Sequence, residues 1–356
     1  MKILITGACG FVGSAVAESL LLRCEGLSIT GMDNLMRPGS EINRSRLRRL
    51  GIGFVHGDIR VASDFEALPP AANWVIDASA NSSVLAGVRG QLNTRQLFEH
   101  NLASIVNVLE YCKRHNAGMV LLSSSRVYSI AKLRSLPLKT DGDAFQLDDT
   151  APLPAGVSAE GICVDFSTRS PISLYGCTKL ASEMIALEYW NAFGFPVWVD
   201  RCGVLAGAGQ FGTHDQGIFS YWINAHLRRR PLRYIGFEGV GRQVRDVFHP
   251  TDLAALISAQ MRGGTAGDRR VYNVGGGLQN SMSLAQLTAW CDARFRPHQP
   301  MADAHERPYD VPWLIMDSHC AQQDFGWRVE VRIQRLLEEI ADHAEQNPDW
   351  LEMSSM

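Results

Sequence analysis

The sequence predicts an α/β fold in which a Rossmann-type, doubly wound parallel sheet is joined to a smaller C-terminal α/β lobe. Two observations support this prediction. In the first half of the chain, short apolar runs alternate with longer amphipathic stretches, which is typical of βα units around a parallel sheet. After residue 201 this alternation loosens, and glycines and prolines interrupt residues 203–241 and 296–312. A chain of 356 residues is long enough for both parts.

Each element is expected from its own apolar pattern. Short apolar runs predict strands at residues 3–6, 27–33, 53–56, 74–79, 119–123 and 196–201. Amphipathic stretches predict helices at 12–23, 97–115 and 175–193, and a later one at 332–343 with Ile333, Leu336, Leu337 and Ile340 on one face. We expect residues 1–201 to form the sheet domain, residues 242–262 to return to it, and residues 202–241 and 263–356 to form the lobe.

Composition and charge exclude several classes of protein. The 34 basic and 37 acidic residues leave a formal net charge of −3, so the chain lacks the positive field by which proteins bind nucleic acid. No apolar run approaches the roughly 18 residues of a membrane span, so no membrane partner is expected. No signal-peptide pattern follows Met1.

The cysteines and histidines indicate neither disulfides nor a metal site. Eight cysteines are scattered without a C-x-x-C pair, which favours reduced thiols and a cytoplasmic location. The spacing of His214, His226 and His249 matches no ligand set, so no metal is expected.

A glycine-rich turn predicts a dinucleotide site at the start of the chain. Gly7, Gly10 and Gly13 lie directly between the first strand and the first helix. Glycines at these offsets allow a sharp turn, close approach of a pyrophosphate to the helix N-terminus, and tight packing of helix on strand. Phe11 and Val12, within this turn, are expected to contact the cofactor as well.

An acidic residue at the end of the second strand favours NAD over NADP. Asp33 follows Gly13 by 20 residues, where a carboxylate can hold the ribose hydroxyls and repel a 2′-phosphate. Its neighbour Asn34 is included in the expected cofactor site. Arg37 lies close enough to serve a phosphate instead, which leaves NADP as the alternative. Asp58 and Ile59, after the third strand, are candidates for the adenine contact.

A tyrosine, a lysine and a serine predict acid–base chemistry. Tyr175 and Lys179 are four residues apart and share one helix face. A phenol has an ordinary pKa of about 10, so it needs a nearby positive charge to act as a base near neutral pH. Ser124 lies at the end of the fifth strand, where open parallel sheets bind their ligands, and can hydrogen-bond a substrate oxygen.

Together these residues resemble the extended short-chain dehydrogenase/reductase family, whose members modify nucleotide-linked sugars with NAD. Several stretches resemble its CDP-paratose 2-epimerase (CDP-tyvelose epimerase) branch more than its UDP-galactose 4-epimerases. They are residues 33–35 with 37–41, 175–179, 210–217, 243–247 and 273–277, of which 210–217 (QFGTHDQG) is the most specific.

The resemblance implies roles for individual residues. Ser124, Tyr175 and Lys179 take the places of the family's catalytic set, with Tyr175 as the base. Ser79, Ala80 and Asn101 match positions that line the cofactor, together with Tyr175 and Lys179. Arg245 and Arg307 match arginines that bind the nucleotide diphosphate, a role that suits a planar guanidinium. The expected substrate contacts also include Ser125, Arg126, Val204, Gln210 and Gln216.

The chain also departs from its relatives. Ser125 and Arg126 stand where sugar dehydratases of the family carry an Asp-Glu pair, which disfavours elimination of water; the 2-epimerases have Asn-Lys there. Val204 replaces the sugar-binding Asn of the 4-epimerases. Residues 206–209 (AGAG) replace a Tyr-Gly-Pro-Arg-like run.

The expected function is therefore NAD-dependent epimerisation of a nucleotide-diphosphate sugar, at C2 of a CDP-sugar, through a transient keto-sugar. The alternatives are a 4-epimerase, a net nucleotide-sugar dehydrogenase, and an NAD-binding sensor or scaffold without turnover. The sheet domain would bind NAD and the lobe the nucleotide sugar. The apolar faces of the helices at 97–115 and 175–193 predict a homodimer.

Overall fold

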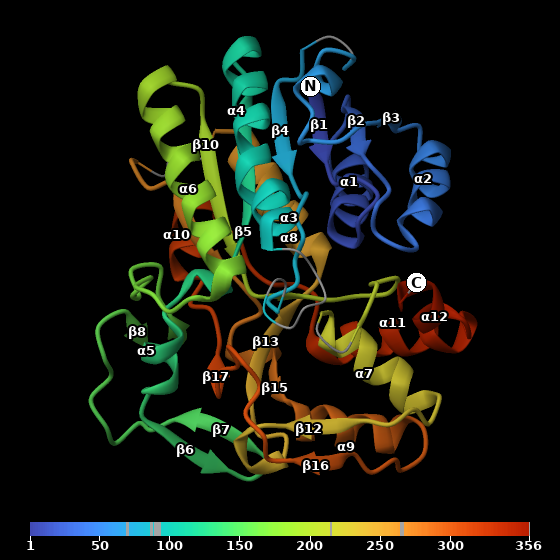
Figure 1. Cartoon of the computed structure of the whole chain (residues 1–356). Coiled ribbons are helices and arrows are strands. Elements are labelled where there is room, and N and C mark those ends of the chain that lie inside the picture. Colours follow the sequence, from blue (N-terminus) through green and yellow to red (C-terminus); the bar gives the residue numbers. More distant parts are fainter. Residues whose placement is uncertain (69–70, 86–87, 89–93, 214–215, 264–266, 356) are drawn as a thin grey trace.

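A seven-stranded parallel sheet forms the centre of the upper part of the molecule (Figure 1). The computed structural model describes residues 1–68, 71–85, 88, 94–213, 216–263 and 267–355. In spatial order, the strands are β14 (Val271–Val274), β10 (Val197–Cys202), β5 (Gly118–Ser124), β4 (Trp74–Asp77), β1 (Lys2–Thr6), β2 (Ser28–Asp33) and β3 (Gly53–His56). The strand order reverses between β1 and β4, and ligands of such sheets bind at the carboxyl ends of the strands beside the reversal.

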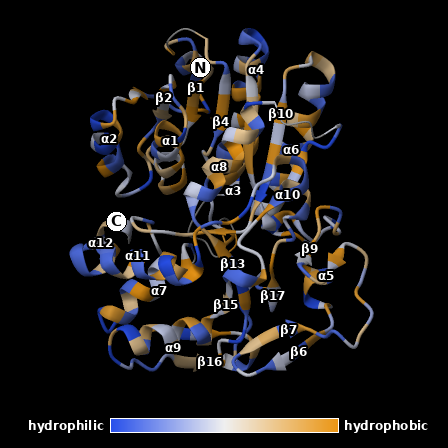
Figure 2. Ribbon diagram, turned by 180° about the vertical axis from the view of Figure 1, so that it is seen from behind, coloured by the Kyte–Doolittle hydropathy of each residue, from blue (hydrophilic) through white to orange (hydrophobic). Residues whose placement is uncertain are grey.

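Helices cover both faces of this sheet, each over its own apolar core. One face packs against α1 (Phe11–Arg23), α2 (Ser40–Arg49), α8 (Pro250–Met261) and α10 (His319–Phe325). The other packs against α4 (Ser104–His115) and α6 (Ser173–Phe193), and α3 (Thr94–Phe98) packs on α6. Figure 2 shows the apolar residues concentrated on the strands between these helix layers. Because helices cover both faces of the sheet, the sequences of its strands contain continuous apolar runs rather than alternating polar and apolar residues.

The lower part of the molecule is built around a small sheet with a third core beside it. Its strands are β11 (Val204–Leu205), β13 (Val244–Phe248), β15 (Ser281–Ser283) and β17 (Trp313–Leu314). Its helices are α7 (Ile218–Leu227), α9 (Leu284–Arg294), α11 (Ile333–Gln346) and α12 (Trp350–Ser355), and β12 (Arg233–Ile235) pairs with β16 (Met301–Asp303). Between β5 and α6 the chain forms α5 (Ile130–Arg134), the hairpin of β6 (Leu138–Asp141) and β7 (Ala144–Leu147), and the short pair β8 (Val157–Ser158) and β9 (Gly161–Ile162).

The predicted fold class is confirmed, and the predicted strands match β1 to β5 and β10 to within two residues at each end. The helix predicted at 97–115 is interrupted, because a π-helical turn at Glu99–Ala103 separates α3 from α4. The Oγ atoms of Ser104 and Ser182 donate to the carbonyls of His100 and Asn101, which satisfies backbone groups within this wider turn.

The structure distributes the second half of the chain differently from the predicted boundaries. β14 lies in the segment 263–356 that was assigned to the lobe, yet it pairs with β10 at the edge of the large sheet, and α10 packs against it. Conversely, β13 lies in the returning segment 242–262 but pairs in the small sheet, while α8 packs on α1. The two-domain division stays a proposal, with β14 and α10 on the sheet side and β13 in the lobe.

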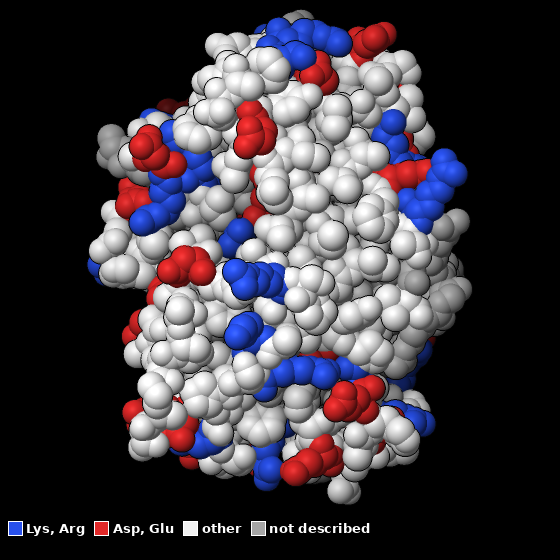
Figure 3. All heavy atoms as spheres, turned by 60° about the vertical axis from the view of Figure 1, so that its left-hand side comes forward, with Lys and Arg blue, Asp and Glu red and all other residues white. Residues whose placement is uncertain are grey.

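The exterior is polar and of mixed charge. Figure 3 shows Lys and Arg interspersed with Asp and Glu over the described part of one face. Among the helices that the structure describes, none has both the length and the apolar character needed to cross a bilayer.

Candidate active site

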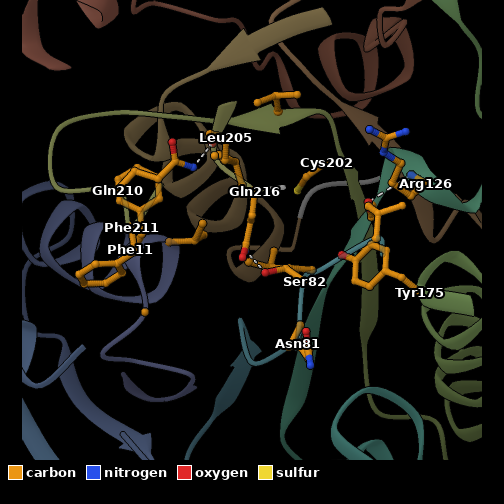
Figure 4. A pocket seen from close by; sticks show the side chains of 18 of the residues that line it. Phe11, Asn81, Ser82, Arg126, Tyr175, Cys202, Leu205, Gln210, Phe211 and Gln216 are labelled. Atoms are coloured by element: carbon orange, nitrogen blue, oxygen red, sulfur yellow. Dashed lines mark hydrogen bonds between the residues drawn. The ribbon is translucent and has the colours of Figure 1, made fainter. Parts of the chain in front are cut away.

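A cavity of about 690 Å³ lies at the carboxyl ends of the large sheet's strands (Figure 4). Its walls come from the loops after β1, β2, β4, β5 and β10 and from the lobe. It brings together almost all of the predicted site residues, namely Gly7, Gly10, Phe11, Val12, Gly13, Asp33, Asn34, Arg37, Ile59, Ser79, Ala80, Ser124, Ser125, Arg126, Tyr175, Lys179, Val204, Gln210, Gln216, Arg245 and Arg307.

The glycine loop forms a cradle that only glycine permits. Gly7 has φ +69°, and a Cβ there would lie 2.8 Å from the backbone of Ala78 and Ser79 in the neighbouring loop. A Cβ on Gly13 would overlap the carbonyl oxygen of Gly7. The N-terminus of α1 carries no capping side chain and no acidic residue in its first turn. Its N–H groups and partial positive charge therefore fit the pyrophosphate of a dinucleotide.

Asp33 closes the other side of this cradle. Its carboxylate accepts hydrogen bonds from the backbone N–H of Cys9 (2.9 Å) and of Leu35 (2.8 Å), and burial raises its pKa above the usual value. Arg37, the alternative phosphate ligand, turns toward the lobe, where it donates to Gln216 Oε1 (2.6 Å) and to the carbonyl of Phe211 (2.8 Å). This engagement of Arg37 agrees with NAD rather than NADP.

Two predicted cofactor residues, Asp58 and Asn101, are not among the residues that line the cavity. Asp58 pairs with Arg60 and accepts a hydrogen bond from Asn34 Nδ2 (3.0 Å). Asn101 is buried and bonds the backbone of Asn81 in both directions, at 2.8 and 2.9 Å. Each therefore holds a residue of the cavity wall in place.

Tyr175, the proposed base, lies at the opposite end of the cavity from Phe11 at the start of α1 (Figure 4). Ser124 is the last residue of β5 and lies beside Tyr175 in the cavity. Burial raises the pKa of Tyr175, whereas the neighbouring Ser124 hydroxyl and the charge of Arg126 act in the opposite direction. Burial lowers the pKa of Lys179, against the charge of Asp77. The cation that acts on the phenol here is thus Arg126, and the stabilising effect predicted for Lys179 stays a prediction.

A buried ion pair fixes the helix that carries Tyr175. Glu183, two turns along α6, accepts hydrogen bonds from Arg201 Nη2 (2.7 Å) and Nε (3.1 Å) in β10. At the start of the helix, a Cβ on Gly176 would overlap the carbonyl oxygen of Arg126. The helix can therefore approach the end of β5 closely enough for Tyr175 to reach Ser124.

Three arginines, Arg126, Arg245 and Arg307, line the cavity. Arg245 donates to Asp310 Oδ1 (2.7 Å) and to the carbonyl of Val311 (2.7 Å). Burial and the charges of Arg245 and Arg307 lower the pKa of Arg126 to about 10. Guanidinium groups gathered in this way suit a diphosphate.

Sequence reasoning missed several residues of the cavity wall. Ser82 accepts a hydrogen bond from Gln216 Nε2, a contact that joins the loop after β4 to the lobe (Figure 4). Gln243 lines the cavity with its Oε1 buried and without a hydrogen-bond partner among the described residues. Gln243 lies two residues before Arg245, and Asp310 lies three residues after Arg307. Their closeness to predicted site residues could have identified them, whereas nothing in the sequence around Ser82 pointed to the cavity. His214 and Asp215 of the QFGTHDQG stretch lie outside the described residues.

Carboxylates are scarce in the cavity. Among the described residues that line it, the only ones are Asp33 and Asp310. Asp33 is engaged by the glycine loop and Asp310 by Arg245. Among the described residues that line the cavity, no further carboxylate is therefore present to act as an acid or base for elimination.

Comparisons with known proteins agree with this site. A CDP-paratose 2-epimerase of Salmonella typhi is 30% identical over 291 residues, which cover 81% of this chain and 82% of that protein. UDP-glucuronate 4-epimerase 2 of Arabidopsis thaliana is 28% identical over 94% of this chain and 73% of its own length. The crystal structure of UDP-glucose 4-epimerase with UDP-glucose from Thermotoga maritima has the same fold, with a TM-score of 0.75 and 21% identity over 98% of this chain and all of that one.

The family model described as the NAD dependent epimerase/dehydratase family matches residues 3–275, which contain the glycine loop, Ser124 and Tyr175. The chain therefore belongs to the NAD dependent epimerase/dehydratase family, and it is an enzyme whose cofactor is NAD.

Proposed function

We propose that this enzyme epimerises a nucleotide sugar, at C2 of a CDP-sugar. The observation that carries the proposal is the placement of Ser124 and Tyr175 in one cavity with the glycine loop and the three arginines. Epimerisation needs a base beside a dinucleotide and a site that anchors the nucleotide. It needs no additional acid for the loss of water, which accords with the scarcity of carboxylates.

The side chains divide the chemistry among them. Ser124 holds the oxygen of the reacting hydroxyl, and Tyr175 removes its proton. The glycine loop and Asp33 would hold NAD, which would supply reversible hydride transfer at the sugar carbon. Arg245 and Arg307 hold the diphosphate while the keto-sugar turns, and Tyr175 then returns the proton to the hydroxyl of the epimer.

The choice of C2 and of CDP is the finer part of the proposal. It is supported by the similarity to the Salmonella typhi CDP-paratose 2-epimerase and by the resemblance of residues 210–217 and 243–247 to that branch. The similarity to the Arabidopsis thaliana UDP-glucuronate 4-epimerase favours C4 of a UDP-sugar as the second candidate.

We also propose that the enzyme is a homodimer through α4 and α6. These helices expose Val106, Met184 and Phe193, which are large apolar side chains that a second copy would cover. Sedimentation of the purified protein at the mass of one chain would contradict this.

The test is turnover of a panel of nucleotide sugars. The purified protein with NAD is incubated with CDP-paratose, UDP-glucuronate and UDP-glucose, and NMR identifies the carbon whose configuration changes. We expect a C2 epimer of the CDP-sugar without accumulation of reduced nicotinamide. A C4 epimer of a UDP-sugar would show that the proposed carbon and nucleotide are wrong. Net reduction of NAD would indicate a dehydrogenase. Binding of NAD with no turnover of any of the three contradicts the proposal.

A further inference from the structure

The backbone of Arg126 contacts both Ser124 and the residue that follows Tyr175. It lies in the 3₁₀ turn Ser125–Val127 directly after β5, and its backbone N–H donates to Ser124 Oγ (3.1 Å). Its carbonyl packs against Gly176, the residue after Tyr175. Figure 4 shows Arg126 and Tyr175 at the same end of the pocket. The Cα of Arg126 therefore lies close to Ser124 and Tyr175, the residues expected to contact the reacting carbon of the sugar.

The guanidinium of Arg126 lines the cavity, and the described residues provide few hydrogen bonds and no ion pair to balance its charge. Its one side-chain hydrogen bond within the described residues runs from Nη1 to the carbonyl of Tyr309, at 3.3 Å. No described carboxylate is within ion-pair distance, because the nearby Asp310 pairs with Arg245. A guanidinium that is partly removed from water in this way is unfavourable unless an anion binds there.

The guanidinium groups at this end of the cavity suit a phosphate. Arg126, Arg245 and Arg307 all line the cavity, and a guanidinium holds phosphate oxygens through paired hydrogen bonds. A sugar carboxylate is the other anion that Arg126 could hold, and CDP, which carries no sugar, distinguishes the two in a binding experiment.

We propose that Arg126 binds the sugar-side phosphate of the nucleotide sugar and thereby presents C2 to Tyr175. This inference rests on the proposed epimerase function. In a hexose, C2 is bonded to the anomeric carbon that carries the phosphate, whereas C4 lies across the ring. A phosphate anchored beside Ser124 and Tyr175 leaves C2 next to them, while reaction at C4 requires the phosphate to be held a ring's width away.

Binding of CDP and CMP to the NAD-loaded protein tests the phosphate contact. Arg126→Gln removes hydrogen bonds to a charged group, so we expect CDP to bind about 10- to 100-fold more weakly. CMP, which lacks the second phosphate, is expected to bind unchanged. Arg126→Lys keeps the charge and is expected to recover part of the affinity for CDP, which guards against misfolding of the glutamine variant.

Arg134→Gln is the matched control for a merely structural role. Arg134 braces the same loop from outside, through Nε to the carbonyl of Asp310 (2.9 Å) and an ion pair with Glu306. We expect it to leave CDP binding unchanged. If it reproduces the loss seen for Arg126→Gln, or if Arg126→Gln weakens CDP and CMP equally, Arg126 acts by holding the loop and the inference is overturned. A loss confined to UDP-glucuronate, with CDP binding unchanged, overturns it as well.

Deuterium in the substrate tests the carbon. A CDP-sugar labelled at C2 is expected to turn over more slowly than the unlabelled sugar, and one labelled at C4 at the same rate. Slowing by the C4 label overturns the placement of C2 but leaves the epimerase function standing. If CDP and CMP respond as expected but no sugar is epimerised, the proposed function fails while the phosphate contact holds.

Discussion

Replacing Glu183 with glutamine tests how α6 is held in position. Glu183 and Arg201 have side chains that are 2% and 9% exposed, and the carboxylate also accepts a hydrogen bond from Ser123 Oγ. Glu183→Gln keeps the shape and one acceptor oxygen but removes the negative charge. Arg201 keeps its bonds to the carbonyl of Val164 (2.9 Å) and to Tyr128 Oη (3.3 Å), both of which are neutral acceptors.

The cost follows from leaving a buried cation without its counter-charge. Removing one partner of a buried ion pair destabilises proteins by about 3–5 kcal/mol, and the acceptor that glutamine retains places this change near 3 kcal/mol. That is a large part of the roughly 5–15 kcal/mol by which folded proteins are stable. Urea denaturation followed by tryptophan fluorescence measures it as a lower midpoint with an unchanged slope.

The double variant Glu183→Leu with Arg201→Met is the control. It leaves no buried charge, so it is expected to be more stable than Glu183→Gln alone. A loss below about 1 kcal/mol for the single variant, or a double variant less stable than the single one, would refute the reasoning.

Two further predictions concern the pH dependence of stability and the cofactor cradle. Burial raises the pKa of Asp200 to about 7, whereas it is about 3.9 in an unfolded chain. Between these two pH values the folded state binds more protons than the unfolded state, so the stability of the protein falls as the pH rises from about 4 to about 7. Asp200→Asn should flatten that fall in urea denaturation at pH 5 and pH 8, and the same fall in both proteins would contradict the assignment. Gly13→Ala places a Cβ against the carbonyl of Gly7 and should abolish NAD binding in a fluorescence titration. Gly53→Ala, where a Cβ meets only ordinary contacts, should bind NAD normally, and unimpaired NAD binding by Gly13→Ala would contradict the cradle.

Local patterns predicted the sheet because its strands are buried on both faces. Each of β1, β4, β5 and β10 contains at least three consecutive apolar residues, so neither register nor tertiary context is needed to recognise it. α2 was missed for the opposite reason. Its sequence SEINRSRLRR has no apolar stripe, and Leu47 alone enters the core.

The site was predictable where its chemistry lies within one short stretch. The glycine loop spans residues 7–13, and Tyr175 and Lys179 are one helical turn apart, so each can be recognised from neighbouring residues alone. Both line the same cavity in the structure. The engagement of Arg37 could not be predicted, because its partner Gln216 is 179 residues away. The same holds for β14, whose place at the sheet edge depends on pairing with β10 rather than on a pattern of its own.

The most direct test of the catalytic assignment is the turnover of Tyr175→Phe with NAD bound. Phenylalanine keeps the ring that lines the cavity and removes only the hydroxyl that is proposed to act as the base. Loss of a general base lowers rates by about 10²–10⁴-fold, so we predict a fall in kcat of that size with NAD affinity unchanged. A variant that epimerises nucleotide sugars at the wild-type rate would show that Tyr175 is not the base.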